Sequence, residues 1–140
     1  MPGSLYKQNK PAALKPELVK EFVVAAHGKL DRTQELLLQE PGLLNATWDW
    51  GAGDFETGLG GASHMGNREI ANFLLSKGAR MDIFTAAMLG KLEIIQTIIK
   101  IYPDMISCKG PHGISLLKHA KAGGKESGPV VAFLETQGAK

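Results

Sequence analysis

The sequence predicts a mainly α-helical fold, an α-solenoid of stacked helix–turn–helix units with short or missing β-hairpin fingers. Three observations predict it. A glycine-containing junction recurs four times, the apolar residues beside it recur at helical spacing, and a single hairpin this short cannot bury its own apolar face. With 140 residues and a hydrophobic fraction of 44%, the chain has the size and composition of one folded domain.

Each unit is recognised at its junction, where small residues end one helix, a glycine follows and an apolar helix begins. The four junctions are Val24–Leu30, Gly61–Asn67, Ala86–Leu92 and His119–Lys125. A glycine suits this place because the left-handed conformation that ends many helices costs other residues energy. The units cover about residues 17–46, 47–80, 81–106 and 107–140, after a flexible lead-in of residues 1–16 that holds three of the seven prolines.

The apolar spacing after each junction is helical. In the third unit Leu92, Ile95 and Ile99 fall at positions i, i+3 and i+7, which is one face of a helix. Ile70 and Leu74 repeat this spacing in the second unit. Each unit is therefore expected to hold two helices, the second more apolar than the first.

Two of these units resemble the ankyrin repeat family. The family motif is matched by two stretches, each followed by a Gly-Ala pair: residues 56–66 with Gly78-Ala79, and residues 113–120 with Gly138-Ala139. Gly58 and Gly60 stand where the family has Pro and His. The resemblance covers about residues 17–140 and extends to small bacterial ankyrin proteins with a similar finger at Trp48–Gly51. It implies a protein–protein interaction module that binds through its concave face and fingers.

The spacing of the junction glycines departs from the family period of about 33 residues. The interval from Gly28 to Gly66 is longer than this period, and the interval from Gly66 to Gly90 is much shorter. The interval from Gly90 to Gly124 is close to it. We therefore expect a long finger between the first two units and almost none between the second and third.

Charge and composition exclude several classes of protein. The net charge is only +2, and a nucleic-acid partner usually requires a clustered basic face, so no nucleic-acid partner is expected. No apolar run approaches the roughly 20 residues of a membrane span, and the single Cys108 rules out an internal disulfide. Because the lead-in has no apolar signal region, we expect a cytoplasmic protein, with an exported mature chain as the alternative.

The long finger, residues 45–57, is the expected binding element because it holds both tryptophans beside several acids. We expect it to contact an unidentified protein partner, helped by side chains near the ends of the first helices. The candidate contact residues are Trp48, Asp49, Trp50, Asp54, Phe55, Glu56, His64, Met65, Met88, Leu89 and His112. The structural alternative is that the two indole rings fold back and cap the stack. A monomer or weak dimer is expected.

The alternative function is a small-molecule or metal-binding protein, conceivably an enzyme, centred on Asp49, Asp54, Glu56 and His64. These residues do not follow the spacing of a calcium loop or of any zinc motif, so neither a metal nor another cofactor is expected. His27 and His64 occupy similar places in successive units, which would allow the rings to lie near each other on one face. The simpler interpretation of each histidine is a surface or helix-capping role.

Catalytic interpretations have little support. Cys108 could pair with His112 or His119, and Ser63 or Ser115 with a histidine, but no nucleophile motif surrounds them. The glycines at 58, 60 and 61 lack the lysine of a phosphate loop and are better explained by close helix packing. An enzyme is therefore not the favoured class.

Overall fold

A computed structural model describes residues 11–140, and in this part of the chain the protein is mainly α-helical. The helices are α2 (Pro16–Ala25), α3 (Leu30–Gln39), α4 (Gly58–His64), α5 (Arg68–Ser76), α6 (Ile83–Met88), α7 (Leu92–Ile101), α8 (Leu116–Ala122) and α9 (Gly128–Thr136). Short 3₁₀ turns are η1 (Pro41–Asn45), η2 (Pro103–Ser107), η3 (Pro111–Gly113) and η4 (Gly124–Ser127). Among residues 11–140, no helix combines the length and apolar character that crossing a membrane requires.

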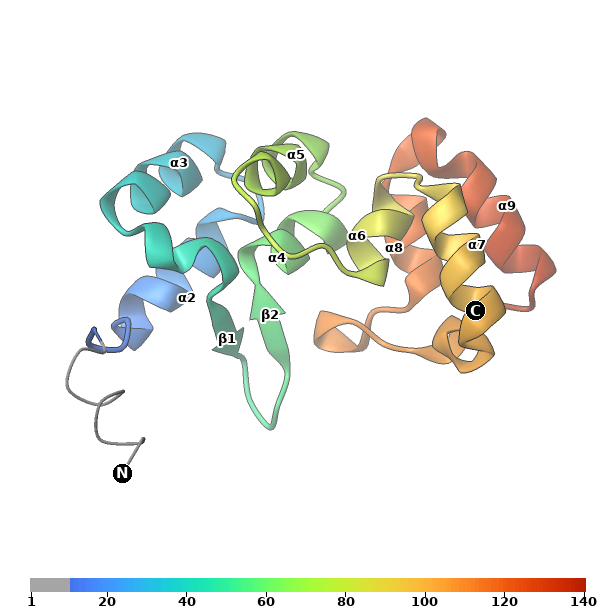
Figure 1. The fold of residues 1–140 in the computed structure, drawn as a ribbon, viewed down its shortest axis with the longest axis horizontal. Helices are drawn as coiled ribbons and strands as arrows, with labels where there is room; N and C mark the ends of the chain where they lie inside the picture. The colour runs from blue at the N-terminus through green and yellow to red at the C-terminus, as the bar shows by residue number, and fades with distance from the viewer. Residues whose placement is uncertain (1–10) are drawn as a thin grey trace, which may run out of the picture.

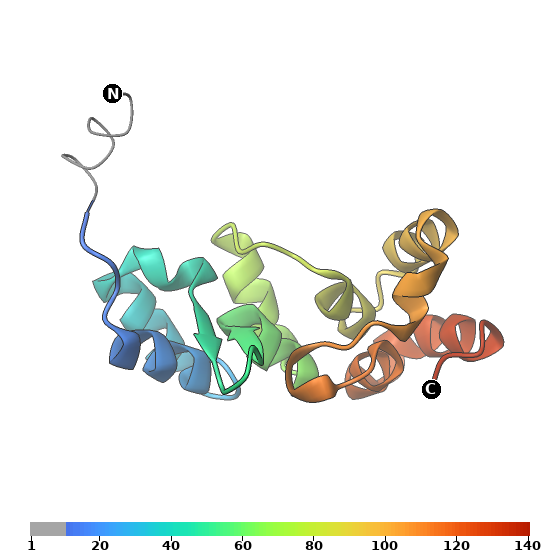
Figure 2. The same ribbon diagram turned by 90° about the horizontal axis from the view of Figure 1, so that it is seen from below.

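Consecutive helices pair into four hairpins that follow one another along the long axis of the molecule (Figures 1 and 2). The first helices of the hairpins contact in series, α2 with α4, α4 with α6, and α6 with α8. Each hairpin therefore packs against its neighbour, which allows short helices to bury apolar faces that one hairpin alone could not cover.

The junction glycines differ from one another. Gly66, Gly90 and Gly124 have positive φ angles of 67°, 75° and 71°, whereas Gly28 does not adopt the left-handed conformation expected of it. A Cβ at Gly66 would lie 2.2 Å from the carbonyl oxygen of Ala122, so this glycine also permits the close approach of the last hairpin.

The expected lead-in of residues 1–16 is only partly described. Residues 1–10 lie outside the described part of the chain. Residues 11–15 have no regular structure, and Leu14 packs against the first apolar cluster. Pro16 already belongs to α2, at the helix position where its missing N–H is harmless.

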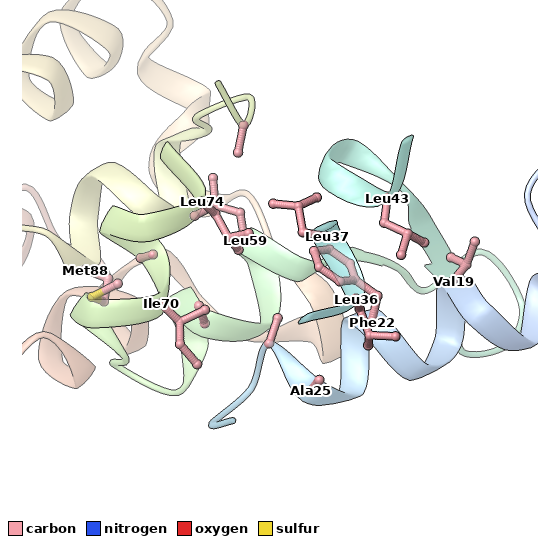
Figure 3. Packing of buried hydrophobic residues seen from close by; sticks show 14 of the residues in the cluster. Val19, Phe22, Ala25, Leu36, Leu37, Leu43, Leu59, Ile70, Leu74 and Met88 are labelled. Atoms are coloured by element: carbon pink, nitrogen blue, oxygen red, sulfur yellow. The ribbon is translucent and has the colours of Figure 1, made fainter. Parts of the chain in front are cut away.

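Among the described residues the core consists of two apolar clusters, the first built mainly from α2 to α5 and the second mainly from α6 to α9. Figure 3 shows the first, in which Phe22, Leu36 and Leu59 pack together from three helices. Met88 is fully buried and Leu89 is nearly so, both in this cluster. These two side chains therefore do not form the partner-contacting surface expected of them, because the stacking of α6 on α4 covers them.

The fingers have the predicted lengths. The first is an antiparallel hairpin of β1 (Thr47–Asp49) and β2 (Phe55–Thr57), with Trp48 opposite Glu56. Between the second and third hairpins, residues 77–82 lead directly from α5 into α6. The short sheet agrees with the expected minor β structure.

The second pair of hairpins repeats the first. Helix α7 is as long as α3, and each is followed by a five-residue 3₁₀ turn that starts with proline, η2 after α7 and η1 after α3. The strand pair Thr47–Thr57 has its counterpart in a single bridge between Lys109 and Ser115. The segment 110–114 is therefore a shortened second finger, and it reaches the first finger.

Candidate metal centre

Four side chains converge beside the first finger: His27, Glu56, His64 and His112. One possible ligand atom of each lies within 4.8 Å of all the others. His27 Nε2 is 3.1 Å from His64 Nε2 and 3.3 Å from Glu56 Oε1. Glu56 Oε2 is 2.9 Å from His64 Nε2 and 3.4 Å from His112 Nε2. The carboxylate thus lies at the centre of three imidazoles.

Each candidate ligand comes from a different local structure. His27 lies in the turn after α2, and His64 is the last residue of α4. Glu56 is the middle residue of β2, where side chains alternate between faces, so Glu56 is buried while Phe55 is exposed. His112 lies in η3, on the shortened second finger.

Gly61 provides the space for the His27 ring. A Cβ at this position would lie 2.7 Å from both Cε1 and Nδ1 of His27. Gly58 similarly makes room for Phe22, with a Cβ contact of 2.8 Å. Gly58 and Gly61 therefore serve close packing, as expected, and at Gly61 the packed group is a ligand candidate.

Two of the three imidazoles are oriented through Nδ1. His27 donates from Nδ1–H to the Val23 carbonyl at 2.8 Å, and His112 donates from Nδ1–H to Asp54 Oδ2 at 2.9 Å. When such a ring is neutral, its Nε2 presents a lone pair that an ion can take; when the ring of His27 is protonated, Nε2–H instead donates toward Glu56 Oε1. Metal-binding histidines in proteins are commonly fixed in this way.

His112 has an unusual backbone. Its φ is 60°, a left-handed conformation that is uncommon for residues other than glycine. The backbone N–H of His112 donates to Asp54 Oδ1 at 2.8 Å, so Asp54 binds this residue twice. These hydrogen bonds hold a strained turn in the orientation that directs its ring to the cluster.

Glu56 is ionised although it is buried. Trp50 donates from Nε1 to Glu56 Oε1 at 2.9 Å. Burial alone would raise the pKa of Glu56, but the imidazoles of His27 and His64 outweigh it and hold the pKa far below its usual range. The same contact with Glu56 raises the pKa of His27 against the effect of burial. Glu56 Oε2 accepts no hydrogen bond of suitable geometry from the described residues.

The arrangement fits the donor set of a transition-metal site. A tetrahedral ion with ligands at 2.0–2.1 Å separates the ligand atoms by about 3.3–3.4 Å. Four of the separations run from 2.9 to 3.4 Å, although they involve both carboxylate oxygens of Glu56, and the whole set lies within 4.8 Å, so small side-chain movements would close a tetrahedral shell. Three imidazole nitrogens and one carboxylate oxygen suit Zn²⁺ and its neighbours, whereas Ca²⁺ and Mg²⁺ prefer oxygen ligands.

The predicted contact residues divide into separate groups. Trp50, Asp54, Glu56, His64 and His112 meet at the cluster. Asp49 instead accepts hydrogen bonds from the amides of Gly51 and Gly53 at the finger tip. Trp48 is half-buried beside α2, with Lys20 above its ring, while Phe55 and Met65 are exposed.

The sequence analysis did not include His27 among the candidate ligands. The available signal was that His27 and His64 occupy equivalent positions in successive units, which stacking brings together. Of the set Asp49, Asp54, Glu56 and His64, only the last two present ligand atoms. Asp49 and Asp54 orient backbone and ring groups instead.

The catalytic pairs considered from sequence do not form among the described residues. Ser63 donates to the Leu59 carbonyl, and Ser115 accepts from the backbone N–H of Lys118 as a helix cap. Burial raises the pKa of Cys108, which disfavours the reactive thiolate. His119 is fully buried and donates from Nδ1 to the Ser115 carbonyl, which already accepts the backbone N–H of His119. It is therefore a core histidine rather than the surface or helix-capping group expected from the sequence.

Compared with protein-family models and with curated proteins, the chain matches none. The function is therefore argued from the geometry of the site.

Proposed function

We propose that the protein binds one divalent transition-metal ion, Zn²⁺ foremost, through His27, Glu56, His64 and His112. The observation that carries this proposal is the convergence of three imidazoles on one buried carboxylate, whose Oε2 lies 2.9 Å from His64 Nε2 and 3.4 Å from His112 Nε2 without a hydrogen bond of suitable geometry. A buried charge that is incompletely compensated is costly. A bound cation would compensate that cost.

The number of protein ligands bears on the role of the ion. Four ligands complete a tetrahedral shell, whereas catalytic zinc sites usually keep one position for water. The site therefore favours metal binding or a structural role over hydrolysis.

The direct test is metal content and affinity. Chelator-treated protein is incubated with Zn²⁺ and desalted, and the bound zinc per chain is measured by mass spectrometry, with calorimetry for affinity. We expect one ion per chain. Glu56→Gln keeps the size of the side chain but removes the charge, and we expect affinity to fall by about tenfold or more.

The matched control is Glu93→Gln, on the exposed face of α7, which should bind zinc as the wild type does. Less than one zinc per chain in the wild type, or unchanged affinity in Glu56→Gln, would contradict the proposal.

For the architecture of the protein that carries this site, we propose an ankyrin-type solenoid of four repeats. Its support is the serial contact of the first helices and the recurrence of glycine at the junctions. The Gly78-Ala79 and Gly138-Ala139 pairs follow the second helices of two hairpins, as the resemblance implies.

Protein recognition by the first finger is the second candidate function. Phe55 and Met65 are both 58% exposed, although large apolar side chains are usually buried. A photocrosslinking amino acid at position 55 should capture a partner in cells, whereas the same group at Lys100, an exposed polar position on α7, should not. Equal capture at both positions would contradict a specific finger contact.

A further inference from the structure

We infer that the bound ion is a clasp between the two halves of the molecule, joining the first finger to the shortened second finger. This inference rests on the proposed metal binding and gives the ion its role. It concerns segments distant in sequence, because α5, α6 and α7 all lie between His64 and His112. The ion would thereby hold the shortened second finger, residues 110–114, against the first finger.

The ligands are divided unequally between the halves. His27, Glu56 and His64 belong to the first pair of hairpins and lie 2.9 to 3.3 Å apart. His112 alone belongs to the second pair, and its Nε2 lies 3.4 Å from Glu56 Oε2. An ion held by the first three ligands would therefore complete its shell by drawing in His112.

His112 is also the most accessible ligand. Its side chain is 35% exposed, against 24% for His27, 11% for His64 and 0% for Glu56. Exposure and a strained turn make η3 the part of the site that opens with least loss of packing. We therefore expect a metal ion to enter and leave the site on the side of His112.

Asp54 already makes the connection that the ion would strengthen. Its carboxylate lies in the first finger and accepts from both Nδ1 and the backbone N–H of His112 in the second. The Trp50 and His112 rings also lie close together, with centroids 5.8 Å apart. These contacts pre-position His112, and a metal–nitrogen bond would lock it.

Loss of the ion would loosen the fingers without separating the halves. Arg68, in the first half, donates to the carbonyls of Met88 and Gly123 in the second, both at 2.9 Å. Helix α4 also packs against α6 and α8. The effect of the clasp is therefore expected at the fingers, with little change in the outer helix α3.

Hydrogen exchange of the full chain with and without Zn²⁺ tests the inference. The informative amides are those of Trp50, His112 and Gly113, which bind Asp54 or Gly110. If these amides exchange by opening of the clasp, their exchange should slow by up to about a hundredfold at free zinc one hundred times its Kd. Amides of α3 should change much less.

His112→Asn provides the matched variant, because Asn tolerates positive φ but its shorter side chain does not reach the cluster. Zinc should still bind the remaining three ligands with reduced affinity. At saturation, zinc should slow exchange in the first finger of this variant and leave the amides of Gly110, Gly113 and Ile114 at their metal-free rates.

The outcomes separate the two proposals. If the wild type binds no zinc, the proposed function fails and the clasp fails with it. If zinc binds at one per chain but slows exchange only in the first finger, metal binding stands and the clasp is wrong. Equal slowing in α3 and in the second finger would also overturn the clasp, because zinc would then act on global unfolding alone.

Discussion

His27 can join the cluster only because residue 61 is a glycine and has no Cβ. The ring of His27 occupies the space that a side chain at Gly61 would fill, with Cβ distances of 2.7 Å. Such a contact forces a shift, and the imidazole is the movable partner. At the residue scale the site therefore depends on a glycine that is not itself a ligand.

Substituting this glycine should separate metal affinity from stability. In Gly61→Ala we expect zinc affinity to fall by about tenfold or more because His27 is displaced, although alanine favours the helix by up to about 1 kcal/mol. Gly60→Ala is the control, since its Cβ would meet no atom closer than 3.4 Å. Calorimetric titration of both variants checks this, and equal affinities would contradict it.

His119 should make stability depend on pH. Burial lowers its pKa below 6.5, so below that pH the unfolded chain takes up a proton that the folded chain refuses. The free energy of unfolding should therefore fall as the pH drops from 6.5 toward the lower folded-state pKa. Below that value His119 adds no further loss.

The test compares wild type with His119→Gln by urea unfolding at pH 7.5 and 5.5. His27 has a raised pKa and acts in the opposite direction in both proteins, so the difference between them isolates His119. We expect the wild type to lose more stability than the variant on acidification. An identical loss would rule out His119 as the cause.

At the scale of elements, the missing finger between the second and third hairpins places a helix start directly after a short connector. Asp82 caps α6 by accepting from the backbone N–H of Thr85 at 2.9 Å. Within residues 11–140 no strand pair supports this end of the helix, so the cap is its main local restraint.

Removal of this cap should destabilise the protein measurably. We expect Asp82→Ala to lower the free energy of unfolding by about 1 kcal/mol, and Asp82→Asn to lower it by much less because the amide oxygen still accepts. Urea unfolding at constant pH measures both. If Asn is as harmful as Ala, the charge of Asp82 matters rather than the cap.

At the scale of the whole molecule, Arg68 joins the two halves in addition to the packing of their helices and the Asp54–His112 hydrogen bonds. Arg68 donates to carbonyls of Met88, Leu89 and Gly123 and forms an ion pair with Glu126 at 3.0 Å. Its planar group satisfies the ends of two helices simultaneously, which a lysine could not do.

Arg68→Ala should therefore cost about 2 kcal/mol of stability, since it leaves several helix-terminal carbonyls without a charged donor. Glu126→Gln should change stability by less than about 0.5 kcal/mol because the Glu126 side chain is largely exposed. Thermal unfolding of the two variants distinguishes these roles. Similar losses in both would mean that the ion pair, rather than the carbonyl contacts, carries the effect.

The helices and finger lengths could be predicted from sequence because they depend on local spacing. The stretch Leu92–Ile99 has the apolar period of a helix, and the interval from Gly66 to Gly90 is too short to hold a finger. The fate of Met88 and Leu89 was not predictable in this way, since a helix end is buried or exposed according to the neighbour that packs on it.

By itself, the sequence determined a mainly helical chain with one long finger, because helix period and junction glycines are local properties. Only the tertiary structure brought His27, Glu56, His64 and His112 together. Their spacing along the chain is wide and irregular and matches no metal motif. They meet because stacked hairpins bring equivalent ends side by side and a shortened finger returns to the first, and these are relations between elements that local spacing does not record.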